Sequence, residues 1–246
     1  MVCIFSLEHA PYEDPVYITR WLADRSLEVN HIRLFRGDPL PDLSEVGFLL
    51  IMGGPMNIYE EDKYPWLIEE KQFIKNVIIA KIPILGICLG GQLIADVLGG
   101  IVTKSIFPEY GWHTVTRNTD ILLNPDMEKD TISRLFPERI EVFQWHQDTF
   151  TIPSGAIPLY QSEFCFNQAF MYNNKVVGLQ FHPEMDKDTI QEFLSLSNQE
   201  LTDKGLLHLR DDILHRIDLC TQGHNFVAEL IQYLINTDEI KNKTLF

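Results

Sequence analysis

One segment of the chain joins an apolar strand pattern, a tight glycine-flanked turn and a helical pattern, and it constrains the fold more than any other. Residues 82–87 are an apolar run, residues 89–98 continue with helical spacing, and Gly99 and Gly100 close the helix. Cys88 lies between the two patterns, with a glycine two residues before it and another two residues after it. A strand, a sharp turn and a helix in this order are typical of a nucleophile elbow, which holds a reactive side chain at the top of a sheet.

The position of Cys88 also favours a reactive thiol. A cysteine at a helix N-terminus faces the positive end of the peptide dipoles, which stabilises the thiolate. The flanking glycines suit a turn in which a Cβ would collide with a neighbouring element or in which φ is positive. A free cysteine is commonly just a small buried side chain, so this segment alone leaves both interpretations open.

Length and composition are those of one large domain, or of one domain with an extension. The chain has 246 residues, of which 45% are hydrophobic, so it can bury a full core. No run approaches the roughly 18 apolar residues of a membrane span, and the first residues lack the basic start of a signal peptide. Four scattered cysteines predict neither a disulfide framework nor a zinc site. We therefore expect no membrane association and a reduced, cytoplasmic setting.

The charge balance argues against one class of partner. The formal net charge is −15, from 35 acidic and 20 basic residues, and such a surface repels phosphate backbones. We expect no nucleic-acid partner. No metal site is predicted either, because five histidines outside the motifs below follow no metal-ligand spacing: His9, His31, His208, His215 and His224.

The first hundred residues alternate between strand and helix patterns. Strands are predicted at residues 2–7, 28–35 and 47–52, and a helix begins at Pro15 and continues through Leu22. Alternating strands and helices favour a parallel, doubly wound sheet, whose sites gather at the carboxyl ends of its strands. A second helix is predicted over residues 66–80, with an apolar stripe formed by Ile68, Phe73, Ile74, Val77 and Ile78.

The second half of the chain is less regular. Residues 101–170 fit short strands separated by turns better than long helices, and residues 175–181 form another apolar strand pattern. Helices are predicted at residues 190–196 and 213–235, the latter interrupted near Gly223. We expect residues 1–190 to form the catalytic domain and residues 191–246 to be a helical extension packed on that same domain.

The last core strand runs into residues that suit catalysis by a cysteine. Such a nucleophile needs a base within hydrogen-bond reach and a group that orients the base. His182 and Glu184 lie on the same side of an extended chain, and Pro183 favours an extended backbone at His182. The alternative is a surface turn with a solvated glutamate.

Acyl chemistry also needs hydrogen-bond donors for a developing oxyanion. The backbone N–H of Leu89, directly after the nucleophile, is one candidate, and Gly54 in the Gly53-Gly54-Pro55 loop is another. The alternative for this loop is a simple turn.

Together the motifs at residues 53–55, 86–92 and 180–184 resemble the class I (triad-type) glutamine amidotransferases, in both order and spacing. The segments 109–112, 145–148 and 166–170 are similar to counterparts in the stand-alone, GMP-synthase-like branch of that family. The resemblance implies an α/β fold with a mostly parallel, doubly wound, flavodoxin-like sheet flanked by helices, followed by a C-terminal helical region.

The resemblance also implies roles for individual residues. Cys88 would be the nucleophile, His182 the general base and acid, and Glu184 the orienting carboxylate. Gly54 and Leu89 would form the oxyanion hole. Four further residues would bind the substrate: Gln92, Tyr110, Gly111 and Trp112. No cofactor and no metal are implied.

Two positions in these motifs stay open. Gly91 stands where many members carry histidine, and because that residue is not the base, we do not expect the change to inactivate the site. His146, beside Trp145, either faces the substrate or has a purely structural role.

The implied reaction is hydrolysis of the γ-carboxamide of glutamine through a cysteine thioester, giving glutamate and ammonia. Three hypotheses follow for the biological role. The chain is an amidotransferase subunit that passes ammonia to a separate synthetase, or a stand-alone γ-glutamyl hydrolase or peptidase, or a non-catalytic binding or redox-sensing module.

Overall fold

A single mixed sheet of nine strands runs through residues 3–236, the part of the chain that the computed structural model describes. Its strand order is β2-β1-β3-β4-β9-β8-β7-β5-β6. The strands are β1 (Cys3–Glu8), β2 (Val29–Arg33), β3 (Val46–Ile51), β4 (Ile84–Ile87), β5 (Val102–Arg117), β6 (Arg139–Phe150), β7 (Ile157–Gln161), β8 (Ala169–Tyr172) and β9 (Val176–Leu179).

The half of the sheet that carries the elbow is parallel. Strands β2, β1, β3, β4 and β9 pair in parallel, in the order of a flavodoxin-like sheet. Central strands such as β4 are apolar and buried throughout, because helices cover both faces of the sheet. The predicted α/β class and its doubly wound arrangement are therefore confirmed.

The other half of the sheet is antiparallel and corrects one expectation. Instead of short strands between turns, β5 and β6 have 16 and 12 residues and form a long antiparallel pair, with η3 and α4 in the connection between them. The register shifts between Lys104 and Glu109, so the alternation of side chains is broken within β5. Because of this irregularity, one continuous strand has the sequence pattern of two short pieces.

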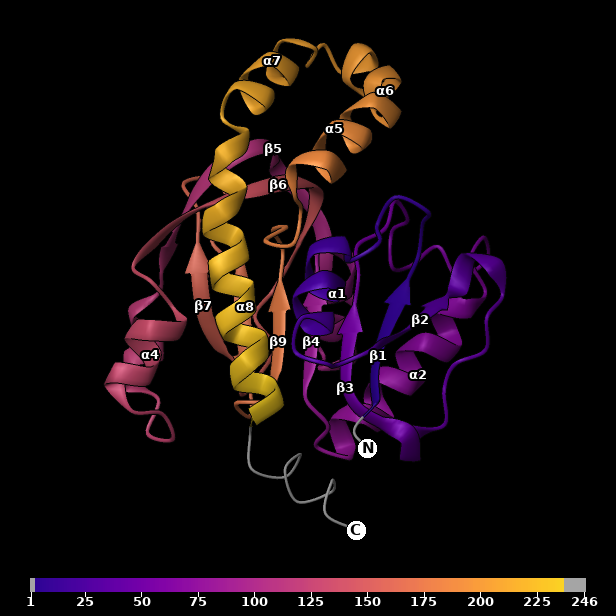
Figure 1. Cartoon of the computed structure of the whole chain (residues 1–246), viewed down its shortest axis with the longest axis vertical. Helices are drawn as coiled ribbons and strands as arrows, with labels where there is room; N and C mark the ends of the chain where they lie inside the picture. The colour runs from indigo at the N-terminus through magenta and orange to yellow at the C-terminus, as the bar shows by residue number, and fades with distance from the viewer. Residues whose placement is uncertain (1–2, 237–246) are drawn as a thin grey trace.

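Helices cover both faces of the sheet (Figure 1). The α-helices are α1 (Val16–Ala23), α2 (Trp66–Ile79), α3 (Leu89–Val97), α4 (Lys129–Leu135), α5 (Lys187–Leu196), α6 (Asn198–Asp203), α7 (His208–His215) and α8 (Cys220–Asn236). Short 3₁₀ turns are η1 (Leu34–Arg36), η2 (Leu43–Glu45), η3 (Thr119–Leu123) and η4 (Ile217–Leu219). Within residues 3–236, no helix combines the length and the apolar character needed to cross a membrane.

Two apolar clusters lie on opposite sides of the sheet. Helices α1, α4 and α8 supply one cluster, with Ile18, Ile132 and Phe226 among its buried side chains. Helices α2 and α3 supply the other, with Phe73 and Leu93. The sheet is thus the middle layer of a three-layer α/β arrangement.

The apolar stripe of α2 is rotated relative to the prediction. Phe73, Ile74 and Val77 are buried as expected, but Ile68 is 57% exposed, and Leu67 is buried in its place. Glu70 also lies on the buried face, because its hydrogen-bond partner is there. The buried face therefore keeps Phe73, Ile74 and Val77 but has Leu67 and Glu70 where Ile68 was expected.

Helices α5, α6 and α7 lie together at the end of the molecule to which β9 points (Figure 1). They enclose a third apolar cluster, which includes Phe193, Leu201 and Ile213. Helix α5 starts at Lys187, earlier than predicted, because Asp186 caps it by accepting a hydrogen bond from the Thr189 N–H at 2.9 Å.

The predicted interruption of the last helix is real but lies elsewhere. The break falls at Arg216 and η4, between α7 and α8, and Gly223 is inside α8. A Cβ on Gly223 would lie 3.0 Å from the Pro183 Cα, so this glycine permits close packing of α8 against the chain. Part of the prediction that residues 191–246 pack on the main domain concerns residues 237–246, which lie outside the described residues.

Gly91 lies where α3 crosses β9. A Cβ there would be 2.5 Å from the Leu179 carbonyl oxygen and 3.0 Å from the Leu179 nitrogen, and both are backbone atoms that cannot rotate away. A side chain at position 91 therefore does not fit this packing without a shift of the helix.

We predict that Gly91→Ala lowers the free energy of unfolding by about 1–3 kcal/mol, the usual cost of overpacking. Urea denaturation of both proteins measures the difference. Alanine otherwise favours a helix over glycine by about 1 kcal/mol. An unchanged or raised stability would therefore contradict the close approach.

Candidate active site

A cavity of about 330 Å³ opens at the carboxyl ends of the parallel strands. Its size is that of a site for a small molecule. The loops after β1, β3, β4 and β9 reach it, and so do β6 and α5. Among its walls are Glu13, Gly54, Cys88, Leu89, Gln92, His182, Tyr12, Trp145, His146, Phe193 and Ser197.

Cys88 occupies a strained turn between β4 and α3. Its φ of 52° and ψ of −105° are unusual for a residue with a side chain, and such conformations cluster at functional sites. The Cys88 N–H donates to the Leu179 carbonyl at 2.8 Å, which ties the turn to β9. A Cβ on Gly90 would lie 2.2 Å from the Ile51 carbonyl oxygen, so only glycine lets α3 begin this close to β3. This is the nucleophile-elbow geometry.

His182 and Glu184 meet Cys88 from the end of β9. The His182 Nδ1–H donates to Glu184 Oε1 at 2.8 Å, and both side chains are buried. The His182 N–H donates to the Phe143 carbonyl at 2.9 Å, which fixes the backbone of this segment against β6. With Nδ1 occupied, the other ring nitrogen remains for the hydrogen bond with Cys88.

The charges of this group favour an imidazolium. Burial lowers the pKa of His182, but the charge of Glu184, together with the charge and hydrogen bond of Cys88, raises that pKa well above its ordinary value. A nucleophile, a base and an orienting carboxylate are thus within reach of one another.

The side-chain amide of Gln180 contacts Cys88. Gln180 Nε2 is 3.7 Å from Cys88 Sγ, and Gln180 Oε1 accepts a hydrogen bond from Gln92 Nε2 at 3.2 Å. Gln92 lines the cavity, as predicted for a substrate-binding residue, although its role stays a prediction. Gln180 stands within a recognised motif, but sequence reasoning assigned it no function.

The two predicted oxyanion-hole residues are neighbours in space. Gly54 and Leu89 both line the cavity, and a Cβ on Gly54 would lie 2.8 Å from Leu89 Cδ2. Their backbone N–H groups belong to the loop after β3 and to the start of α3, which converge beside Cys88. Their function as donors remains a prediction.

The structure places Tyr110, Gly111 and Trp112 outside the cavity wall. The Trp112 Nε1–H donates to the Ile213 carbonyl at 3.1 Å, and Gly111 faces the Ile213 side chain. Tyr110 packs edge-on against Trp145 with ring centroids 5.1 Å apart. Trp145, the partner of Tyr110 on the neighbouring strand β6, lines the cavity instead.

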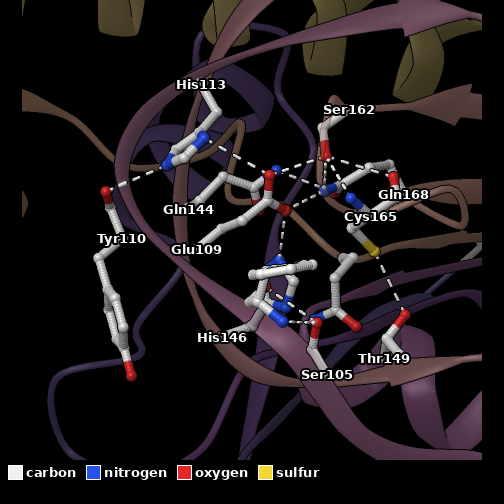
Figure 2. Close-up of polar contacts among 12 residues, drawn as sticks. Ser105, Glu109, Tyr110, His113, Gln144, His146, Thr149, Ser162, Cys165 and Gln168 are labelled. Atoms are coloured by element: carbon white, nitrogen blue, oxygen red, sulfur yellow. Dashed lines mark hydrogen bonds and ion pairs between the residues drawn. The ribbon is translucent and has the colours of Figure 1, made fainter.

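His146 both lines the cavity and is held from behind by a buried polar network (Figure 2). Its Nε2 lies 3.0 Å from Glu109 Oε2, and its Nδ1 lies 2.9 Å from the Asp148 carbonyl oxygen. Glu109 also accepts from the Ser162 hydroxyl at 2.7 Å and from Gln168 Nε2 at 2.5 Å. Burial raises the pKa of Glu109, but the hydrogen bonds from His146 and Ser162 lower it overall. Both ring nitrogens are thus engaged, and His146 shapes the wall.

Sequence reasoning missed several residues at the cavity. Tyr12, Glu13, Phe193 and Ser197 belong to no motif, and the loop after the first strand and the C-terminal helices had no assigned role. Their only signal was that Tyr12 and Glu13 follow a strand of the parallel sheet, where sites gather.

Glu13 is the most unusual of them. Its side chain lies beside Gly53, whose Cβ position is also 3.1 Å from His182 Cε1. Burial raises the pKa of Glu13 from 4.5 to about 7, although the charge of His182 opposes the change. Two carboxylates, Glu13 and Glu184, therefore flank one imidazole.

We predict that Glu13→Gln stabilises the protein above pH 7. Between pH 4.5 and about 7 the unfolded chain loses a proton that folded Glu13 keeps, so this residue lowers the unfolding free energy as the pH rises through that window. The loss of unfolding free energy is about 3 kcal/mol at most. A glutamine at this position does not ionise and does not cause this loss.

Urea denaturation at pH 5 and pH 8 tests this prediction. The advantage of Glu13→Gln over the natural protein is expected to be larger at pH 8. Glu192→Gln, at an exposed position of α5, serves as the control and changes neither value. An advantage of Glu13→Gln that is the same at both pH values would contradict a raised pKa.

A flavodoxin-like α/β sheet with a cysteine, a histidine and a carboxylate at its carboxyl edge defines a class of hydrolytic and transfer enzymes. Residues 16–196 match the family model of glutamine amidotransferase class-I. The chain belongs to this family.

Individual relatives agree with that assignment. The glutamine amidotransferase-like protein YfeJ of Salmonella typhimurium is 30% identical over 199 residues, which is 79% of this chain and 81% of YfeJ. A GMP synthase (glutamine-hydrolyzing) subunit of Sulfolobus acidocaldarius is 37% identical over 147 residues, which is 58% of this chain and 70% of that protein. The crystal structure of a glutamine amidotransferase from Thermotoga maritima superposes with a TM-score of 0.86 at 31% identity, covering 96% of this chain and 99% of that one. The resemblance inferred from the motifs is confirmed.

Proposed function

We propose that this chain hydrolyses the γ-carboxamide of glutamine through a thioester on Cys88, releasing glutamate and ammonia. The observation that carries the proposal is that Cys88 and His182 meet in one cavity at the carboxyl edge of the sheet, where Glu184 binds the far nitrogen of the His182 ring. The family to which the chain belongs supports amide hydrolysis and transfer in general.

In this proposal the Cys88 thiolate attacks the γ-carbonyl carbon and His182 gives its proton to the leaving nitrogen. The N–H groups of Gly54 and Leu89 stabilise the negative oxygen of the tetrahedral intermediate. Water, deprotonated by His182, then cleaves the thioester. The raised pKa of His182 suits this sequence, because the ring must hold a proton until ammonia leaves.

We infer that a separate synthetase is the natural acceptor of the ammonia. The relatives named as subunits of GMP synthase support this inference, because a subunit is by name part of a larger enzyme.

A second candidate is hydrolysis of the γ-glutamyl amide of a larger amine. Trp145 and Phe193 pack edge to face with ring centroids 5.0 Å apart, and both line the cavity. Such an aromatic wall offers apolar surface that ammonia does not need but an organic leaving group does.

We predict that Cys88→Ala lowers kcat for glutamate release by at least about 10³-fold, because the nucleophile is lost. Glutamate is measured for the purified protein with glutamine and with a panel of γ-glutamyl peptides. Cys220→Ala removes another buried thiol outside the cavity and keeps the natural rate. Retained turnover in Cys88→Ala would overturn the proposed function. Stoichiometric oxidation of Cys88 without any turnover would favour a redox-sensing module.

We predict that Phe193→Ala separates the two candidate substrates. If a larger amine leaves, the variant raises KM for γ-glutamyl peptides about tenfold and leaves KM for glutamine within threefold, since burial of part of a ring is worth about 1–2 kcal/mol. Leu196→Ala, at an exposed position on the same helix, is the control. Equal effects of Phe193→Ala on both substrates would contradict a leaving-group role for the aromatic wall.

A further inference from the structure

Behind the loop that carries Gly54 lies an ion pair that no step of the proposed reaction uses. His9 follows β1 and Glu70 lies on α2, and both side chains are fully buried. His9 Nε2 is 2.8 Å from Glu70 Oε1. Burying two ionisable groups away from solvent is costly, so this pair calls for an explanation.

The other ring nitrogen of His9 binds the backbone of the glycine loop. His9 Nδ1 is 2.9 Å from the Gly53 carbonyl oxygen. His9 is also in direct contact with the next residue, since a Cβ on Gly54 would lie 2.9 Å from His9 Cβ. The pair therefore links the first strand, the loop after the third strand and α2 at one point.

This hydrogen bond orients a donor of the proposed oxyanion hole. The Gly53 carbonyl and the Gly54 N–H belong to one planar peptide unit, and that unit is trans, so the two groups point in opposite directions. A carbonyl held toward His9 therefore fixes the direction of the Gly54 N–H, on the opposite side of the peptide unit, and Gly54 itself borders the cavity.

The two contacts of the His9 ring suit a doubly protonated ring. The Gly53 carbonyl oxygen can only accept, so Nδ1 carries a proton, and pairing with an ionised Glu70 would make Nε2 the second donor, which is the imidazolium. Burial lowers the pKa of His9, but the charge and hydrogen bond of Glu70 and the hydrogen bond to Gly53 raise it above its ordinary value. A positive charge on the carbonyl side of a peptide also strengthens the N–H on its other side as a donor.

We propose that His9 is a positioning residue for the oxyanion hole: as an imidazolium paired with Glu70, it fixes and polarises the Gly53–Gly54 peptide so that the Gly54 N–H is aimed at the tetrahedral oxygen. The inference rests on the proposed function, since it assigns a role within that reaction. It predicts an effect on the rate of acyl transfer, whereas a pair that only stabilises the core would affect unfolding alone.

Three substitutions separate orientation from charge. His9→Leu removes the bond to Gly53, whereas the side-chain amide of His9→Asn has an N–H near the position of Nδ1 and keeps that bond. Both leave Glu70 without its partner, so the difference between them reports the bond to Gly53. Glu70→Gln keeps a hydrogen-bonding partner for the ring but removes the charge that favours the imidazolium.

The expected results differ among these variants. His9→Leu lowers kcat by about 100-fold with KM within threefold, which is the order of magnitude of losing an oxyanion-hole donor. His9→Asn recovers at least about tenfold of that loss, and Glu70→Gln lowers kcat by about three- to tenfold. The reaction of Cys88 with iodoacetamide, which forms no oxyanion, stays within about twofold in all three. Circular dichroism confirms that each variant is folded.

A matched control is available in a second histidine–carboxylate pair. His31 binds the buried Glu8 through its Nδ1 on the neighbouring strands β2 and β1, outside the cavity. His31→Asn is expected to leave kcat within twofold.

The charge of His9 is measured independently of turnover. Nitrogen-15 NMR of the natural protein, with the His9 signals assigned by their loss in His9→Asn, is expected to show both ring nitrogens protonated at pH 7.5. If no γ-glutamyl substrate turns over in the natural protein, the proposed function fails, and this measurement still decides whether His9 is the imidazolium. Three results would each overturn the inference. The first is a neutral His9, and the second is a folded His9→Leu whose kcat is within twofold of the natural protein. The third is a parallel loss of kcat and of iodoacetamide labelling.

Discussion

The structure depends on the close approach of α3 to the backbones of β3 and β9. Gly90 and Gly91 remove the side chains that would separate these elements, since a Cβ on either would lie within 2.5 Å of a carbonyl oxygen of Ile51 or Leu179. This packing sustains the positive φ of Cys88, which would otherwise relax. It also brings the first N–H groups of α3 beside the loop after β3, so that the position of the nucleophile and that of its proposed oxyanion donors follow from one contact.

Buried charge is the second organising feature. Glu13, His182 and Glu184 form one group, and His9 with Glu70 forms another behind it. Burial raises the pKa of a carboxyl group and lowers the pKa of an imidazole, so it disfavours the charged form of both. The contacts of each group therefore decide whether it carries a charge. Glu184 and Cys88 raise the pKa of His182, whereas Glu13 has too little opposing charge and its pKa rises to about 7. The loop after β1 thus contributes to the electrostatics of a site whose motifs lie elsewhere in the chain.

The C-terminal helices complete the cavity that the sheet begins. Phe193 of α5 and Ser197 at its C-terminal end form part of its wall, and the third apolar cluster joins these helices to Trp112 of β5 and Phe143 of β6. Strand β6 also carries Trp145 and His146, and the buried Glu109 network holds His146 in place. Cys88 therefore follows β4 in the parallel half of the sheet, whereas this wall is formed by β6 in the antiparallel half and by the C-terminal helices. We infer that substitutions in this wall can change which substrate fits the cavity without moving Cys88, His182 or Glu184.

Local pattern was enough to predict the strands around Cys88, the elbow, the class of fold and the strand ends at which Cys88, His182 and Glu184 lie, because each depends on short-range spacing in a buried parallel sheet. The burial of Glu70, the direction of Tyr110 and Trp112, the unbroken length of β5 and the break before α8 depended on partners far away in the chain. His9 shows the difference most clearly. Its isolated position in the sequence suggested no role, and only the convergence of β1, β3 and α2 brings its two nitrogens to an acceptor on each side. Sequence spacing determines which side chains share a strand end, whereas tertiary packing decides which buried groups meet and what charge they carry.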